Sequence, residues 1–217
     1  MDLLDWGLVE YQEALLRQES LLEEIAQKQS PGALVFCQHP PIVTLGRSTK
    51  PGDVTTWSGP VLEVSRGGRA TYHGPSQLVI YPIINLSIPG HSRAAKDIGA
   101  YLRNFEQAIV ACLKDYGIEA EGRSLQKKSP EIEAGDETGV WVGVKKIASL
   151  GIGVRKWVTF HGAALNVFAD PAAFQGLNPC GFQSSVMVSI EGLTGKKIDL
   201  AILKTNLRAH LEKFLGG

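Results

Sequence analysis

The sequence has little of what marks several large classes of protein. Its three cysteines include no closely spaced pair, so we expect neither a disulfide framework nor a cysteine-rich metal site. Its 22 basic and 22 acidic residues balance, which removes the positive charge typical of nucleic-acid-binding proteins. No apolar run approaches about 18 residues, so no membrane-spanning helix is expected. The first residues lack a signal-peptide pattern, and with reduced thiols this predicts a cytoplasmic protein.

Several familiar catalytic motifs are also missing. The sequence contains no Gly-x4-Gly-Lys-Ser/Thr phosphate loop, no His-Glu-x-x-His, no Cys-x-x-Cys and no Gly-x-Ser-x-Gly. The segment Gly151-Ile152-Gly153 begins like a dinucleotide fingerprint, but Lys156 occupies the position of the third glycine. Nucleotide, zinc and serine-hydrolase functions therefore have no motif to support them, and we expect no metal and no cofactor.

The apolar pattern predicts one domain over residues 1–217, with helices alternating with groups of strands. Helical spacing predicts helices over 8–26, 93–116 and 200–214, with Ser92 as the N-cap of the second. Short apolar runs predict strands, and Pro82 indicates that the strand over 77–86 is an edge strand or carries a bulge. The polar region 125–137 predicts a surface loop. This order favours an α+β (mixed α/β) domain around one sheet, with strands at 33–37, 42–45, 61–64, 77–86, 140–144, 147–154, 157–160 and 163–168.

Cys180 has the most unusual setting of the three cysteines. It lies between Pro179 and Gly181, which predicts a turn from which its sulfur faces a cleft. Cys37 lies in an apolar run and Cys112 on a predicted helix stripe, so both are expected to be small buried hydrophobic residues. A buried thiol remains the alternative for Cys180.

A lysine pair interrupts the strand-like run 140–150. Because side chains alternate along a strand, one of Lys145 and Lys146 points inward, where an ammonium near a thiol would favour the thiolate. Two solvated lysines in a turn are the alternative.

His73 and His161 each precede a glycine, which would let a ligand approach the backbone; structural histidines fit equally well. His39 is expected in a loop, and His91 and His210 at the surface.

Six segments then carry a family resemblance. They are 38–47 (Gln-His-Pro-Pro-Ile-Val-Thr-Leu-Gly-Arg), 66–78 (Arg-Gly-Gly-Arg-Ala-Thr-Tyr-His-Gly-Pro-Ser-Gln-Leu), 139–142 (Gly-Val-Trp-Val), 146–151 (Lys-Ile-Ala-Ser-Leu-Gly), 161–167 (His-Gly-Ala-Ala-Leu-Asn-Val) and 178–181 (Asn-Pro-Cys-Gly). In this order, over about residues 33–185, they resemble the lipoyl/octanoyl transferase family. The resemblance implies the biotin/lipoyl protein ligase-like fold, a single catalytic domain with a mixed β-sheet flanked by helices.

The resemblance also implies an activity. An acyltransferase of this family moves an octanoyl group from octanoyl-acyl carrier protein, through a cysteine thioester, to a lysine of a lipoyl domain. The acceptors would be the lipoyl domains of 2-oxoacid dehydrogenase acyltransferase subunits and the glycine-cleavage H protein, and the enzyme is expected to be a monomer without nucleic-acid or membrane partners.

Cys180 would be the nucleophile and Lys146 its activating partner. The acyl-binding residues would be Arg66, Gly67, Gly68, Arg69, Ala70, Thr71, Tyr72, His73, Ser149, Leu150, Gly151, His161, Gly162, Ala163 and Ala164.

Two positions depart from the family pattern, and three alternatives remain. Arg69 replaces a usual Gln and Ser76 a usual Gly, so acyl-chain preference is where this chain would differ. An ATP-dependent lipoate ligase of the same fold would not need Cys180. A cysteine-dependent thioesterase would admit water to the acyl-enzyme. A non-catalytic module that binds a carrier protein would leave Cys180 inert.

Overall fold

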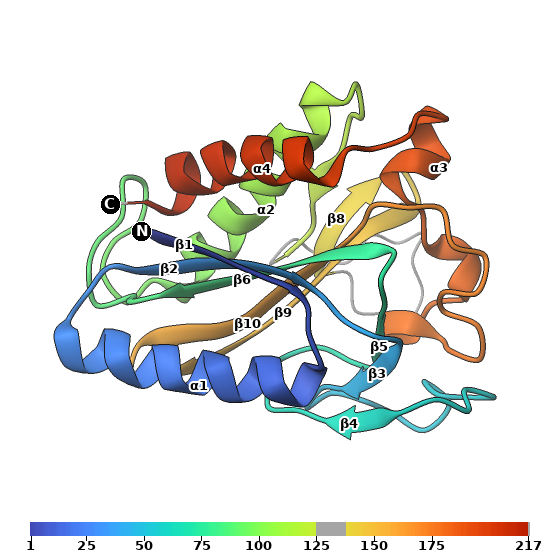
Figure 1. Cartoon of the computed structure of the whole chain (residues 1–217), viewed down its shortest axis with the longest axis horizontal. Coiled ribbons are helices and arrows are strands. Elements are labelled where there is room, and N and C mark those ends of the chain that lie inside the picture. The colour runs from blue at the N-terminus through green and yellow to red at the C-terminus, as the bar shows by residue number, and fades with distance from the viewer. Residues whose placement is uncertain (125–137, 217) are drawn as a thin grey trace.

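The computed structural model describes residues 1–124 and 138–216, and a seven-stranded mixed sheet forms its centre. Its innermost strands are antiparallel, whereas the first strand runs parallel to its neighbour. A second sheet of three strands lies at one end of the first (Figure 1). In spatial order the large sheet contains β1 (Asp2–Leu8), β2 (Gly32–Gln38), β6 (Gln77–Ile84), β10 (Val158–Asn166), β9 (Lys145–Arg155), β8 (Gly139–Val142) and β7 (Glu121–Gly122), and the small one β4 (Val61–Glu63), β3 (Ile42–Leu45) and β5 (Thr71–His73).

Helices cover both faces of the large sheet. Helix α1 (Tyr11–Lys28) packs on one face, and α2 (Ile98–Asp115) and α4 (Leu200–Leu215) pack together on the other (Figure 1). Strand β6 is buried along its whole length because alternate side chains enter the two cores. Leu78, Ile80 and Ile84 join the α2/α4 core, and Val79, Tyr81 and Ile83 join the α1 core.

The predicted mixed α/β class is confirmed, but some boundaries differ. Helix α1 begins at Tyr11 rather than at residue 8, because Leu8 still belongs to β1, an exposed edge strand that the sequence pattern missed. Helix α2 begins at Ile98, and its N-cap is Asp97, whose side chain accepts from the Ala100 N–H; Ser92 is not the cap. The short α3 (Ile190–Thr194) was also missed. The predicted loop 125–137 lies outside the described residues.

Pro82 lies in an interior strand, so the predicted edge position is wrong. On one side it pairs in register with Leu34 of β2. On the other side the ladder with β10 stops at Ile80, before Pro82, which has no N–H to donate. Thr159 replaces the lost bonds: its hydroxyl donates to the Pro82 carbonyl (2.6 Å) and accepts from the Ile84 N–H (2.9 Å).

Two predicted strands are in fact one. The segments 157–160 and 163–168 join through His161 and Gly162 into β10, and His73 is the last residue of β5. His161 has φ of 58°, which a strand residue rarely adopts, and it lies where β10 separates from β6. Strands β2 and β3 belong to different sheets, since β3 pairs in the small sheet.

Candidate active site

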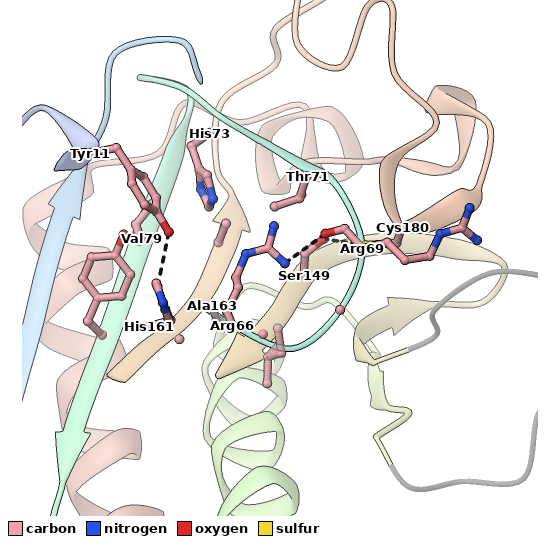
Figure 2. A pocket seen from close by; sticks show the side chains of 16 residues that line it. Tyr11, Arg66, Arg69, Thr71, His73, Val79, Ser149, His161, Ala163 and Cys180 are labelled. Carbon is pink, nitrogen blue, oxygen red and sulfur yellow. Dashed lines mark hydrogen bonds between the residues drawn. The ribbon is translucent and has the colours of Figure 1, made fainter. Parts of the chain in front are cut away.

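A pocket lies where the small sheet meets β6, β9 and β10. Cys180 lies at one side of it, with Tyr11 and His161 at the other (Figure 2). Residues from α1, the 66–73 segment, three strands and the 178–181 turn form its wall. They are Tyr11, Arg66, Gly68, Arg69, Thr71, His73, Val79, Tyr81, Ser149, Leu150, Gly151, His161, Gly162, Ala163, Ala164 and Cys180.

Cys180 occupies the predicted turn and contributes to the pocket wall. The turn is a single 3-10 turn, Pro179–Gly181, in which Cys180 has φ of 56°. A non-glycine residue in this left-handed region is uncommon and tends to occur at functional sites. The Cys180 N–H donates to the Ala70 carbonyl (3.0 Å), and its thiol lies 3.9 Å from the Ser149 hydroxyl. The side chain is only 6% exposed, so the sulfur faces the pocket rather than bulk water.

An ion pair lies directly behind this turn. Asp53 is fully buried and accepts from two nitrogens of the Arg69 guanidinium, one bond being 3.0 Å from Nε. A side chain at Gly181 would collide with this guanidinium, so the ion pair and the turn pack in direct contact. The Asp53 carbonyl also accepts from the Asn178 N–H (2.8 Å). Arg69 is thus tied to the Cys180 turn as well as to the pocket.

Lys145 and Lys146 point to opposite sides of the strand, as strand alternation predicts. Lys146 is completely buried, whereas Lys145 is half-exposed and donates to the Ser185 carbonyl (2.7 Å). The Lys146 Nζ lies 5.4 Å from the ring centre of Trp141 and 5.9 Å from that of Phe182, and these rings pack in one cluster with Cys180. Cation–π attraction offsets part of the cost of burying an ammonium. Lys146 and Cys180 therefore share one aromatic wall.

Arg66 lies at the middle of the pocket and is held by carbonyl and hydroxyl oxygens. Its Nη1 donates to the carbonyls of Gly67 (3.0 Å) and Arg69 (2.9 Å), and its Nη2 donates to Thr44 through the carbonyl (2.9 Å) and the hydroxyl (2.7 Å). Among the described residues it has no carboxylate partner, and its Nε is buried without a hydrogen bond. A positive charge therefore faces the pocket.

The end of the pocket away from Cys180 is formed by neutral aromatic side chains. Burial lowers the pKa of His161 to about 3 and that of His73 well below its usual value. Burial also raises the pKa of Tyr81 well above its usual value and raises that of Tyr11, so both phenols stay protonated. Tyr11 and Tyr81 were not predicted as site residues, because in the sequence they look like ordinary core positions of a helix and a strand.

His39 lies behind this end, in the loop between β2 and β3 as predicted, but it is buried. It is completely buried, its Nδ1 donates to the Val9 carbonyl (2.7 Å), and its Nε2 accepts from the Tyr81 hydroxyl (2.8 Å). Burial lowers its pKa to about 4. Cys37 lies 3.6 Å from the same Nε2, so these three side chains form one buried network. His91 is exposed as predicted, and the partly buried His210 bonds to Asp115 at the surface.

The other two cysteines are buried, as predicted. Burial raises the pKa of Cys112 to about 12 and raises that of Cys37 still further. Neither residue lines the pocket, so at neutral pH both are unreactive thiols.

Most of the predicted substrate-binding residues line the pocket, but three do not. Gly67 faces a neighbouring groove, and Ala70 contributes its carbonyl to Cys180 rather than a wall. Tyr72 points away and packs against Trp57 and Phe174. Within the described ranges, no group of three or more His, Cys, Asp or Glu could hold a metal ion. Over the same ranges, no helix is long and apolar enough to cross a membrane.

Three backbone donors around the pocket already have partners. The Gly181 N–H donates to the Asn178 carbonyl (2.9 Å) and the Cys180 N–H to that of Ala70, and at the opposite end the His161 N–H donates to the Gln18 side chain (2.7 Å).

Cys180 thus lines this pocket, and the buried Lys146 packs against the same two aromatic rings, Trp141 and Phe182. Comparison with known proteins identifies the family. Residues 10–212 match the family model described as the lipoyl protein ligase A/B catalytic domain. The octanoyltransferase of Bdellovibrio bacteriovorus is 56% identical over 212 residues, covering 97% of each chain. That of Syntrophotalea carbinolica is 37% identical, covering 99% of this chain and 94% of its own.

The fold agrees with solved structures of lipoate protein ligases. The bipartite lipoate protein ligase of Thermoplasma acidophilum superposes with a TM-score of 0.65 at 18% identity, covering 99% of this chain and 83% of its own. The chain therefore belongs to the lipoyl protein ligase A/B catalytic-domain family, and its similarity to octanoyltransferases makes it an acyltransferase enzyme.

Proposed function

We propose that the enzyme carries an octanoyl group from an acyl carrier protein to a lipoyl domain through a thioester on Cys180. The observation that carries this proposal is the position of Cys180, whose sulfur faces an enclosed, partly apolar pocket from a strained turn. An acyl chain is stabilised in such a pocket by burial of its methylenes, about 0.8 kcal/mol each. We further propose that residues 1–217 form one catalytic domain.

In the first step the Cys180 thiolate attacks the thioester carbonyl of the octanoyl carrier. A carbon–sulfur bond forms, the tetrahedral intermediate collapses, and the thiolate of the carrier's pantetheine arm leaves and takes up a proton. One thioester replaces another, so the step is close to isoenergetic. We assign the Ser149 hydroxyl, 3.9 Å from the Cys180 sulfur, as a donor to the developing oxyanion.

In the second step the amine of an acceptor lysine attacks the acyl-enzyme. A carbon–nitrogen bond forms, the carbon–sulfur bond to Cys180 breaks, and the thiolate is released. The amine proton passes to a base, and Lys146 in its neutral form is the group we assign to this task. In its charged form Lys146 stabilises the thiolate before and after the reaction. The acceptors are lipoyl domains of 2-oxoacid dehydrogenase acyltransferase subunits and the glycine-cleavage H protein.

Intact-protein mass spectrometry tests the first step directly. Incubation with octanoyl-acyl carrier protein, without nucleotide, is expected to add one octanoyl group, and peptide mapping is expected to place it on Cys180. A matched incubation with free octanoate and ATP tests the ATP-dependent ligase. Modification only in that second incubation would replace the transferase by a ligase. Loss of the octanoyl group to water without any acceptor would indicate a thioesterase, and no modification in either would indicate a binding module.

A further inference from the structure

The end of the pocket away from Cys180 has hydrogen-bonding atoms that the hydrocarbon chain of an octanoyl group cannot satisfy. The His73 Nδ1, the His161 Nε2 and the Arg66 Nε are all buried, and none has a hydrogen-bond partner among the described residues. All three residues line the same pocket. Figure 2 shows Arg66 between the two histidines on one side and Ser149 and Cys180 on the other. Buried polar groups without partners are rare, so three in one pocket indicate a ligand atom.

The hydrogen-bond network allows the His73 Nδ1 to act as a donor. The Thr44 hydroxyl oxygen accepts from Arg66 Nη2 (2.7 Å) and lies 3.2 Å from His73 Nε2. A hydroxyl has one proton and two acceptor sites, so Thr44 can give its proton to Nε2 while it accepts from Arg66. In that arrangement a neutral His73 carries its single proton on Nδ1, the atom without a partner.

The same reasoning makes the other two atoms donors. The Tyr11 hydroxyl lies 3.3 Å from His161 Nδ1, and a buried phenol needs an acceptor for its proton. If Tyr11 donates to Nδ1, neutral His161 carries its proton on Nε2. The Arg66 Nε can only donate. This end of the pocket therefore offers three donors and a positive charge, and it suits an oxygen that only accepts.

The register of the strands places these donors at the far end of a bound acyl chain. Ser149, beside the Cys180 sulfur, pairs with Ala164, and three residues further along the same strands Ile152 pairs with His161. Three residues of strand span about 10 Å. That length is comparable to an extended eight-carbon chain joined to the sulfur. Val79, Leu150 and Ala163 are apolar residues of the wall, and Arg66 lies between the two ends.

We propose that the inner end of this pocket is a subsite for a carbonyl-type oxygen near the end of the acyl chain, so that the enzyme accepts medium-chain acyl groups oxidised at their distal end. The inference rests on the proposed function, because it assumes that the acyl chain lies in this pocket with its carbonyl at Cys180. The proposal adds a class of substrate, acyl groups with a distal oxygen, to which octanoyl does not belong.

The test compares three acyl groups on the same carrier protein: octanoyl, 7-oxooctanoyl and 4-oxooctanoyl. The two oxo compounds have the same composition and differ only in the position of the oxygen. The readout is the rate at which each acylates Cys180, followed by intact mass. We expect 7-oxooctanoyl to react within about threefold of octanoyl, because three donors replace the water it loses. We expect 4-oxooctanoyl to be slower by about 30-fold, because its carbonyl loses water without reaching His73 Nδ1 or His161 Nε2 at the inner end.

A variant of the subsite gives a second, independent measurement. His73→Phe keeps a ring of similar size and removes one donor, so the ratio of the 7-oxooctanoyl to the octanoyl rate is expected to fall about fivefold. Equal losses for the two oxo compounds in the wild-type enzyme would overturn the subsite while leaving the transferase function intact. Failure of octanoyl itself to acylate Cys180 would overturn the proposed function, and the subsite with it.

Discussion

The two ends of the pocket are built in opposite ways. At the outer end, Cys180 lies in a short turn between loop segments, in a backbone conformation that glycine would adopt more readily. At the inner end, His161 and Tyr81 lie on interior strands of the large sheet and Tyr11 on the helix that covers it. In the proposed mechanism the outer end carries the chemistry; it is held by a few polar contacts, whereas the inner end is built on the large sheet and its covering helix. We infer that the turn positions the Cys180 thiol and that the strands of the large sheet limit the length of the acyl chain that the pocket accepts.

The largest expected effect is at the nucleophile. Cys180→Ser keeps the size of the side chain but supplies a hydroxyl without a strong base beside it, so transfer should fall by at least about 10³-fold. The measurement is octanoyl transfer to a lipoyl domain, with circular dichroism to verify the fold. Cys37→Ser and Cys112→Ser are the matched controls, because both thiols are buried away from the pocket. Near-normal transfer by Cys180→Ser would mean that the chemistry uses another group.

The next effect concerns the lysine behind the aromatic wall. Lys146→Met removes the charge while keeping a flexible apolar chain, and transfer should fall by about 10²-fold. Alkylation of Cys180 should also require a higher pH than in the wild-type enzyme. Lys145→Met is the control, since that side chain only bonds a carbonyl at the surface. If alkylation has the same pH profile in Lys146→Met and wild type, the two residues do not act together. A shift seen only in Lys145→Met would reverse the assignment of the pair.

A smaller effect on activity is expected from the ion pair behind the turn. Asp53→Asn removes the carboxylate that holds Arg69 and should lower the free energy of unfolding by about 3 kcal/mol. Because the guanidinium packs against Gly181, the turn should loosen and kcat should fall about tenfold, with KM for the carrier little changed. The exposed Asp2→Asn is the control for a lost carboxylate. Unchanged kcat together with the stability loss would make the pair purely structural.

The smallest effect for each residue concerns acid sensitivity at the inner end. His39, His73 and His161 are neutral in the folded protein, with pKa values of about 4 for His39 and about 3 for His161, whereas unfolded histidine titrates near 6.5. Below about pH 6.5 the unfolded state binds protons that the folded state does not, so stability falls as the pH falls. Each histidine contributes at most about 1.4 kcal/mol per pH unit until its folded pKa is reached.

Urea unfolding at pH 7.5, 6.0 and 5.0 measures this slope. Glu106, whose pKa is raised by burial, acts in the opposite direction, but it is one group against three. A free energy of unfolding that stays constant from pH 7.5 to 5.0 would contradict the claim that the buried histidines are neutral. It would also weaken the contrast between the inner and outer ends of the pocket.

Local patterns in the sequence predicted the outer end better than the inner one. The turn at Cys180 follows from its Pro and Gly neighbours, and the inward direction of Lys146 follows from strand alternation, so both were visible within a few residues. Tyr11 reaches His161 across 150 positions of sequence, and nothing near Tyr11 announces that contact. Asp53 is similar, because a carboxylate in a loop gives no sign of a buried arginine partner. Such residues depend on how distant segments pack, which periodicity does not encode.

The left-handed backbone at Cys180 also has an evolutionary consequence. A side chain with a Cβ in this conformation costs about 1–2 kcal/mol, which glycine avoids and asparagine partly avoids. The residues that suit the backbone best have no nucleophile, so selection for turnover and selection for a stable turn favour different amino acids at this position. A descendant of this enzyme released from its chemical task would be expected to drift to glycine or asparagine here first, and such a replacement would mark the loss of catalysis within the lineage.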